Sequence, residues 1–141
     1  MSESVTFDFE VDGTDFTSAG HASVVVKKNL RQLGISPETI RRVSIAMYEG
    51  EINMVIHAGG GTASVTVDEE RVTIHLTDKG PGIEDINKAM QEGWSTAPDS
   101  VRQLGFGAGM GLPNMKRYSD TLEINSEVGK GTDITMTVNI I

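Results

Sequence analysis

Three side chains at four-residue intervals, Glu49, Asn53 and His57, are the first candidates for chemistry in the sequence. In a helix this spacing places them on one side, where neighbouring isoleucines make an unpartnered carboxylate or amide costly. The amide oxygen of Asn53 suits a hard cation such as Mg²⁺, and a partly desolvated Glu49 suits a general base. A solvated polar stripe is the alternative interpretation. For His57, packing at the end of the helix is favoured over catalysis.

A turn-forming segment, Asp78-Lys-Gly-Pro-Gly, follows the alternating residues 71–77. Asp, Gly and Pro favour turns for local reasons, so an ordinary turn is one interpretation. The other is a binding site, because Gly80 and Gly82 let the backbone approach a flat ligand. At the end of a strand, the carboxylate of Asp78 can accept a hydrogen bond from an exocyclic amine.

Four alternating glycines, Gly105, Gly107, Gly109 and Gly111, lead into a helix that is expected to begin at Leu112. Glycine this dense weakens regular structure, so close backbone approach to a ligand is favoured over a flexible linker. Backbone N–H groups at the start of a helix bind phosphate well. Neither the dinucleotide-binding pattern Gly-x-Gly-x-x-Gly nor a Walker A P-loop occurs in the sequence.

The elements that must position these residues follow from hydrophobic periodicity. Alternation predicts strands over 5–11, 62–68, 71–77, 121–126 and 132–140, the second and third forming one hairpin and the last two another. Helical spacing predicts helices over 18–33, 36–57, 83–92 and 112–118, with 93–111 irregular. This order predicts one α+β domain over 1–141, a two-layer sandwich with a mixed, mostly antiparallel sheet and helices on one face.

Composition narrows the classes of function. The sequence has 12 Lys and Arg and 20 Asp and Glu, and the resulting net charge of −8 disfavours a general nucleic-acid binder. The lack of cysteine excludes disulfides, thiolate metal sites and a cysteine nucleophile. No apolar segment approaches the ~18 residues of a membrane span, and the N-terminus lacks a signal-peptide profile. We therefore expect a cytoplasmic protein that binds neither nucleic acid nor membrane.

The order of these motifs resembles the GHKL ATPase superfamily over nearly the whole chain. The matches are Glu49 and Asn53 to its N box, Asp78, Gly80 and Gly82 to its first glycine box, Gly105–Gly111 to its second, and Gly131-Thr132 to its final adenine-side pair. Within the superfamily the chain looks like the stand-alone serine/threonine kinases of bacterial partner-switching systems. These include the anti-sigma factors SpoIIAB and RsbW and the switch kinase RsbT. Segments 78–86, 93–97 and 111–117 look closest to the RsbT-like branch, whereas 98–103 is longer than that branch leads us to expect.

This resemblance implies a Bergerat-type ATP-binding fold, with ATP and Mg²⁺ as cofactors and a role for each matched residue. Asn53 would ligate Mg²⁺ bridging the ATP phosphates, and Glu49 would be the catalytic base. Asp78 would accept a hydrogen bond from the adenine amino group, supported by Thr132 through water. The other cofactor-binding residues would be Gly80, Gly82, Ile83, Gly105, Gly107, Gly109, Gly111 and Leu112, with 93–111 as a lid.

Three functions from different classes fit these features. The favoured one is an ATP-dependent serine/threonine protein kinase acting on a STAS-type antagonist protein. The second is an anti-sigma factor in which ATP mainly shapes a surface for a sigma factor, and a phosphatase is a further partner. A detached histidine-kinase catalytic domain ranks last, because none of His21, His57 and His75 lies in a long helical hairpin that could present a phospho-acceptor. If the chain forms a homodimer, the sheet edge or the first strand would supply the contact.

Overall fold

The computed structural model describes residues 4–12, 20–80, 82 and 111–140. Their elements, in chain order, are β1 (Val5–Asp12), α1 (His21–Gln32), α2 (Pro37–Ala58), β2 (Gly60–Val67), β3 (Arg71–Asp78), α5 (Gly111–Tyr118), β4 (Thr121–Glu127) and β5 (Gly131–Asn139). Each of these helices and strands was expected from the sequence, with ends that differ by a few residues. The expected helix over 83–92 and nearly all of the irregular segment 93–111 lie outside the described residues.

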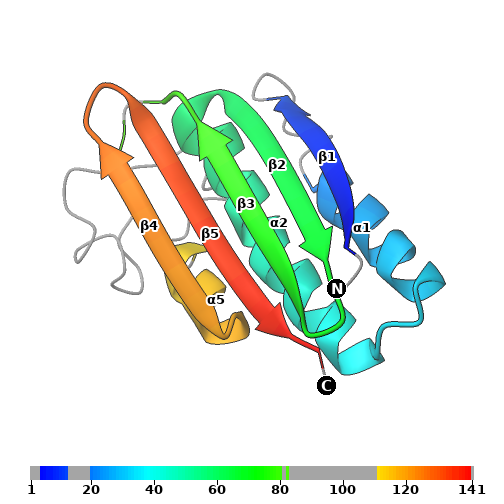
Figure 1. Cartoon of the computed structure of the whole chain (residues 1–141). Helices are drawn as coiled ribbons and strands as arrows, with labels where there is room; N and C mark the ends of the chain where they lie inside the picture. The colour runs from blue at the N-terminus through cyan, green and yellow to red at the C-terminus, as the bar shows by residue number, and fades with distance from the viewer. Residues whose placement is uncertain (1–3, 13–19, 81, 83–110, 141) are drawn as a thin grey trace.

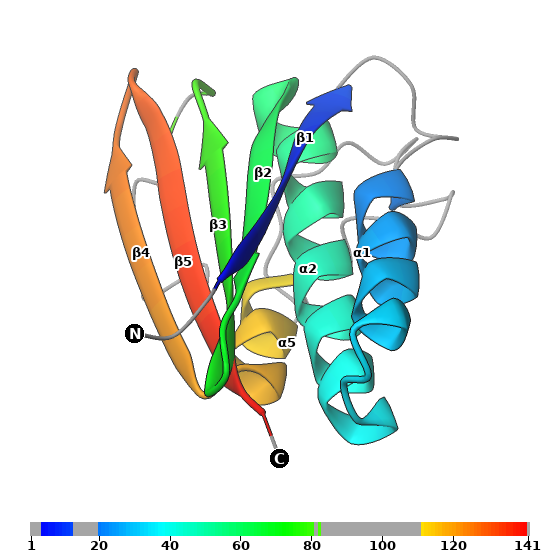
Figure 2. The same ribbon diagram turned by 45° about the vertical axis from the view of Figure 1, so that its right-hand side comes forward.

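The five strands form one sheet in the order β1-β2-β3-β5-β4. All four neighbouring pairs are antiparallel, so the described sheet is antiparallel throughout, where the sequence predicted a mixed and mostly antiparallel one. Strand β5 lies between β3 and β4 and runs opposite to both. Helices α1, α2 and α5 cover the same face of the sheet (Figure 1), and a side view separates the two layers (Figure 2). The predicted two-layer α+β architecture is confirmed.

The core lies between the sheet and the helices. Val65, Ile74 and Met136 form one register row across β2, β3 and β5, and all three are fully buried. Val43 and Met47 of α2 are fully buried too. The alternate strand residues are polar and face away from the helices, which is the pattern of a sheet with one solvated face.

Helix α2 has the ends that the sequence predicts. The hydroxyl oxygen of Ser36 accepts a hydrogen bond from the N–H of Thr39 at 3.4 Å, and Pro37 occupies the first turn. Gly59 ends the helix in a left-handed conformation with a φ of 72°. Strand β2 starts at the next residue, so the end of α2 is tied directly to the sheet.

A buried carboxylate of α2 holds the start of α1, a contact that the sequence did not predict. Glu51 is 2% exposed. Its Oε1 accepts from the N–H of Ser23 at 2.7 Å, and its Oε2 accepts from Gly20 at 3.0 Å and Ala22 at 3.2 Å. N–H groups in the first turn of a helix lack acceptors within the helix, and the helix dipole favours an anion there. Glu51 therefore caps α1 from the neighbouring helix.

Replacing Glu51 with Ala should lower the free energy of unfolding by about 3 kcal/mol, because buried N–H donors lose their acceptor. Glu51→Gln should recover only part of this loss, since its NH₂ group meets N–H donors. Urea denaturation followed by circular dichroism measures both variants. Glu69→Ala, at an exposed position between β2 and β3, is the control and should change stability by less than about 0.5 kcal/mol. A Glu51→Ala protein as stable as this control would contradict the capping role.

Candidate functional site

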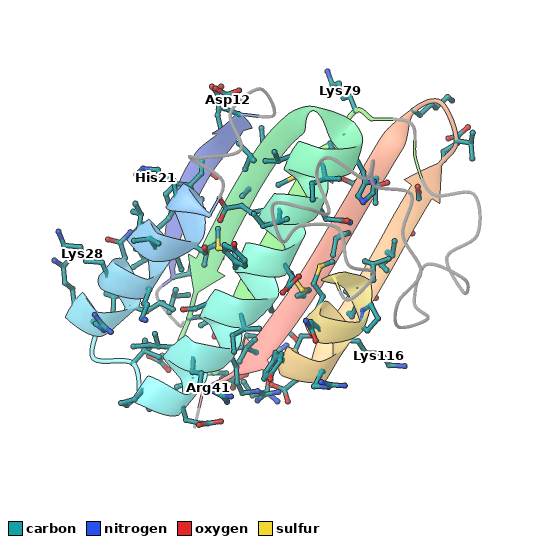
Figure 3. All side chains as sticks on the ribbon, turned by 180° about the vertical axis from the view of Figure 1, so that it is seen from behind. Asp12, His21, Lys28, Arg41, Lys79 and Lys116 are labelled. Atoms are coloured by element: carbon teal, nitrogen blue, oxygen red, sulfur yellow. The ribbon has the colours of Figure 1, made fainter. Side chains whose placement is uncertain are left out.

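Four residues that the sequence singled out, Asn53, Asp78, Gly82 and Thr132, line one cavity. It opens where the end of α2 meets the end of β3 and the start of β5. The described residues that line it are Gly50, Asn53, Met54, His57, Ala58, Leu76, Asp78, Gly82, Thr132 and Ile134. Its volume is about 40 Å³. Figure 3 marks this end of the molecule by Lys79, the residue after β3, with Arg41 and Lys116 toward the other end of the helical layer.

The carboxylate of Asp78 is held by backbone groups from two segments. Its Oδ1 accepts from the N–H of Gly80 at 2.9 Å and from the N–H of Thr132 at 3.2 Å. Both bonds fall on Oδ1, so within the described residues Oδ2 remains available to a donor from a ligand. An ionised carboxylate only accepts hydrogen bonds, and an exocyclic amine is a donor that fits it.

Two glycines allow the backbone to close around Asp78. A Cβ on Gly80 would lie 2.5 Å from the Cβ of Ala58 on α2. Gly131 has a φ of 128°, and a Cβ there would collide with the carbonyl oxygen of Asp78. Glycine is therefore required at position 131 by the close approach of β5 to the end of β3.

Thr132 supports Asp78 through its backbone, opposite Asp78 in the β3–β5 register. Its side chain is directed elsewhere: the two hydroxyl oxygens of Thr132 and Ser126 lie 3.0 Å apart. Thr132 is 8% exposed. A water-mediated contact from Thr132 to adenine stays a prediction.

Asn53 and His57 lie one helical turn apart in the α2 wall of the cavity, and both are half-buried. Burial lowers the pKa of His57, so its imidazole is neutral at pH 7. The sequence favoured packing for His57, but its spacing from Asn53 was the signal that it shares this wall. No group of three or more His, Cys, Asp or Glu in the described residues could hold a metal ion. The amide oxygen of Asn53 on the cavity wall is compatible with Mg²⁺, which is often held by one or two protein ligands together with phosphates and water, and its role as metal ligand stays a prediction.

Glu49 lies one turn before Asn53, outside the cavity lining, and contacts α5. Its Oε1 accepts a hydrogen bond from Nδ2 of Asn114 at 3.4 Å. Burial raises the pKa of Glu49, and the bond from Asn114 opposes this in part. Asn114 was not predicted, because no spacing in the sequence indicates how α5 packs on α2.

Of the remaining predicted site residues, the structure describes Gly111 and Leu112. Gly111 begins α5, and Leu112 is 6% exposed and packs in the hydrophobic core. Ile83, Gly105, Gly107 and Gly109 lie outside the described residues, so their roles stay predictions.

Comparisons with known proteins identify the family of the chain. The family model described as Histidine kinase-like ATPase domain matches residues 14–138. Anti-sigma F factor of Caldanaerobacter subterraneus subsp. tengcongensis is 36% identical over 121 residues, which cover 82% of this chain and 81% of that protein. Serine/threonine-protein kinase RsbT of Bacillus subtilis is 34% identical over 108 residues, which cover 74% of this chain and 75% of that protein.

Solved structures share the fold at low sequence identity. The RsbU and RsbW domains of Rv1364c from Mycobacterium tuberculosis match with a TM-score of 0.67 at 16% identity, over 96% of this chain. The match covers 32% of that chain, so this chain spans about a third of its length. The SiaB-SiaC complex from Pseudomonas aeruginosa matches with a TM-score of 0.56 at 13% identity, over 95% of this chain and 89% of that one.

Within the described ranges, no helix combines the length and the apolar character that crossing a bilayer requires.

The family match spans most of the sequence, and curated relatives above 30% identity cover most of both chains. The antiparallel sheet with helices on one face agrees with the solved neighbours. On these grounds the chain belongs to the histidine kinase-like ATPase domain family, of the GHKL type.

Proposed function

We propose that this chain is an ATP-dependent serine/threonine protein kinase of a partner-switching system, with a STAS-type antagonist protein as its substrate. An ATPase domain implies ATP binding. Relatives named anti-sigma F factor and RsbT kinase support a partner-switching role. The observation that carries the proposal is that one helix bears both Asn53, on the cavity with Asp78, and a half-buried Glu49 beside it.

Asp78 orients the adenine because its Oδ2 accepts a hydrogen bond from the adenine amino group. Gly80 and Thr132 already hold Oδ1, so the carboxylate needs little rearrangement when the base binds. Asn53 holds Mg²⁺ through its amide oxygen. Bound Mg²⁺ supplies neutralisation of the phosphate charge, and with positioning this accounts for most of the barrier lowering in phosphoryl transfer.

Glu49 acts on the protein hydroxyl that attacks the γ-phosphorus. A new P–O bond forms to the Ser or Thr oxygen, the bond to the β–γ bridging oxygen breaks, and the hydroxyl proton passes to the Glu49 carboxylate. A carboxylate with a raised pKa is a stronger base than a solvated one.

The relatives named anti-sigma F factor favour a second function, capture of a sigma factor on a surface shaped by ATP. Incubation with labelled ATP and STAS proteins encoded nearby distinguishes the two. Label on the STAS protein supports the kinase, whereas tight binding of a sigma factor with no transfer supports the anti-sigma factor. A phosphatase that reverses the modification is a further candidate partner.

Asn53→Ala should reduce phosphate transfer to the STAS protein by about a hundredfold or more, because the metal loses its protein ligand. The transfer of ³²P from labelled ATP, followed on gels, measures this. His75→Ala, at an exposed position on the face of the sheet away from the helices, is the control and should transfer at the wild-type rate. Normal transfer by Asn53→Ala would show that this residue does not hold the metal.

Glu49→Gln should bind ATP within about twofold of wild type but lose about 10²–10³-fold in turnover, the usual contribution of a general base. Calorimetry gives the affinity, and gel assays give the rate. The base is active when deprotonated, so the wild-type rate should rise with pH and level off above a pKa that is higher than that of an ordinary glutamate.

In Glu49→Gln the rise of the rate with pH, which is the acidic limb of the profile, should disappear. A variant with the wild-type rate and the same limb would contradict the assignment of Glu49 as base. Loss of ATP binding in Glu49→Gln would assign the residue to nucleotide binding instead.

A further inference from the structure

We infer that Asn114, in the first half of α5, is a positioning residue that orients Glu49 toward the substrate hydroxyl. The inference rests on the proposed function, because it takes Glu49 to be the base. It assigns α5 a part in catalysis through one side chain.

The contact joins two helices whose residues are far apart in the chain. Nδ2 of Asn114 donates to Oε1 of Glu49 at 3.4 Å across a separation of 65 residues, in a partly buried position. Within the described part of the chain, no other donor to the Glu49 carboxylate is found. Among the described residues, Asn114 is therefore the one whose side chain can fix the orientation of this carboxylate.

Packing fixes the place from which Asn114 reaches Glu49. Leu112 and Met115, which flank it on α5, are both buried, Met115 completely. The sulfur of Met115 lies 3.5 Å from where a Cβ would stand on Gly50, the residue after Glu49. Because α5 is seated on α2 at this point, the amide of Asn114 is presented at a defined position rather than by a freely rotating surface side chain.

The chemistry of an amide suits this task. Its N–H occupies Oε1 and leaves Oε2 of Glu49 to accept the proton of a hydroxyl. The amide is neutral, so it orients the carboxylate without the full positive charge of Lys or Arg, which would favour the ionised form strongly and weaken the base. Loss of the bond releases the rotamers of Glu49, and small errors in position are costly in rate.

The test compares Asn114→Leu, which is similar in size and cannot donate, with Lys116→Ala, an exposed position on the same helix. At saturating ATP, Asn114→Leu should lower the rate of transfer to a STAS protein about tenfold, the effect of one orienting hydrogen bond. Its affinity for ATP, measured by calorimetry, should stay within about twofold of wild type. Lys116→Ala should change neither quantity.

A double-mutant cycle separates positioning from general damage to the fold. In a Glu49→Gln background, Asn114→Leu should cause no further loss, because it acts only through the carboxylate. The side-chain amide signal of Asn114 in ¹H–¹⁵N spectra should move on Glu49→Gln and stay in place on Lys116→Ala.

Three results would overturn the inference: a wild-type rate in Asn114→Leu, the same tenfold loss in the Glu49→Gln background, or an amide signal that does not respond to Glu49→Gln. A failure of the proposed function is seen separately. If Glu49→Gln transfers phosphate at the wild-type rate, the base assignment is wrong, and the inference on Asn114 falls with it whatever Asn114→Leu does.

Discussion

Two backbone hydrogen bonds to a single oxygen of Asp78 are the interaction on which the candidate site depends. They tie the end of β3 to the following turn at Gly80 and to the start of β5 at Thr132, 54 residues further along the chain. Without them the carboxylate could rotate away from the cavity. With them, one oxygen is engaged, and within the described residues the other remains available to a donor. Gly131 is part of the same arrangement, since its φ of 128° belongs to the close passage of β5 beside Asp78.

Helix α2 supplies the other half of the site and is itself fixed on several sides. Its buried side chains pack on the sheet, and α5 packs beside Glu49. On a further side, Glu51 accepts three N–H groups from the start of α1. Two carboxylates only two residues apart thus have different tasks. Among the described residues, Glu51 accepts three backbone N–H groups and holds α1, whereas the half-buried Glu49 accepts from one neutral amide, an environment compatible with the proposed base.

The features that could be predicted from the sequence are those set by residues close together in the chain. Alternation and helical spacing located every described element, and Ser36 and Gly59 gave the ends of α2, because caps and periodicity act over a few residues. The resemblance to the GHKL superfamily also implied that Asn53, Asp78 and Thr132 share one site, and the three line the same cavity. In contrast, the partners of Glu51 and Glu49 depend on how helices pack across 28 to 65 residues of chain, and no local pattern encodes that. The burial of Leu112 likewise depends on how α5 packs on the rest of the molecule, which no local pattern encodes.

Calorimetry that compares ATP with GTP, with Mg²⁺ present, measures whether the Asp78 carboxylate selects adenine. Guanine carries a carbonyl oxygen where adenine carries its amino group, so an anchored Asp78 carboxylate would face another acceptor. The account predicts that wild type binds ATP about a hundredfold or more tightly than GTP, and that Asp78→Ala removes most of this preference. Equal affinities for the two nucleotides, or no uptake of ATP by wild type, would contradict it.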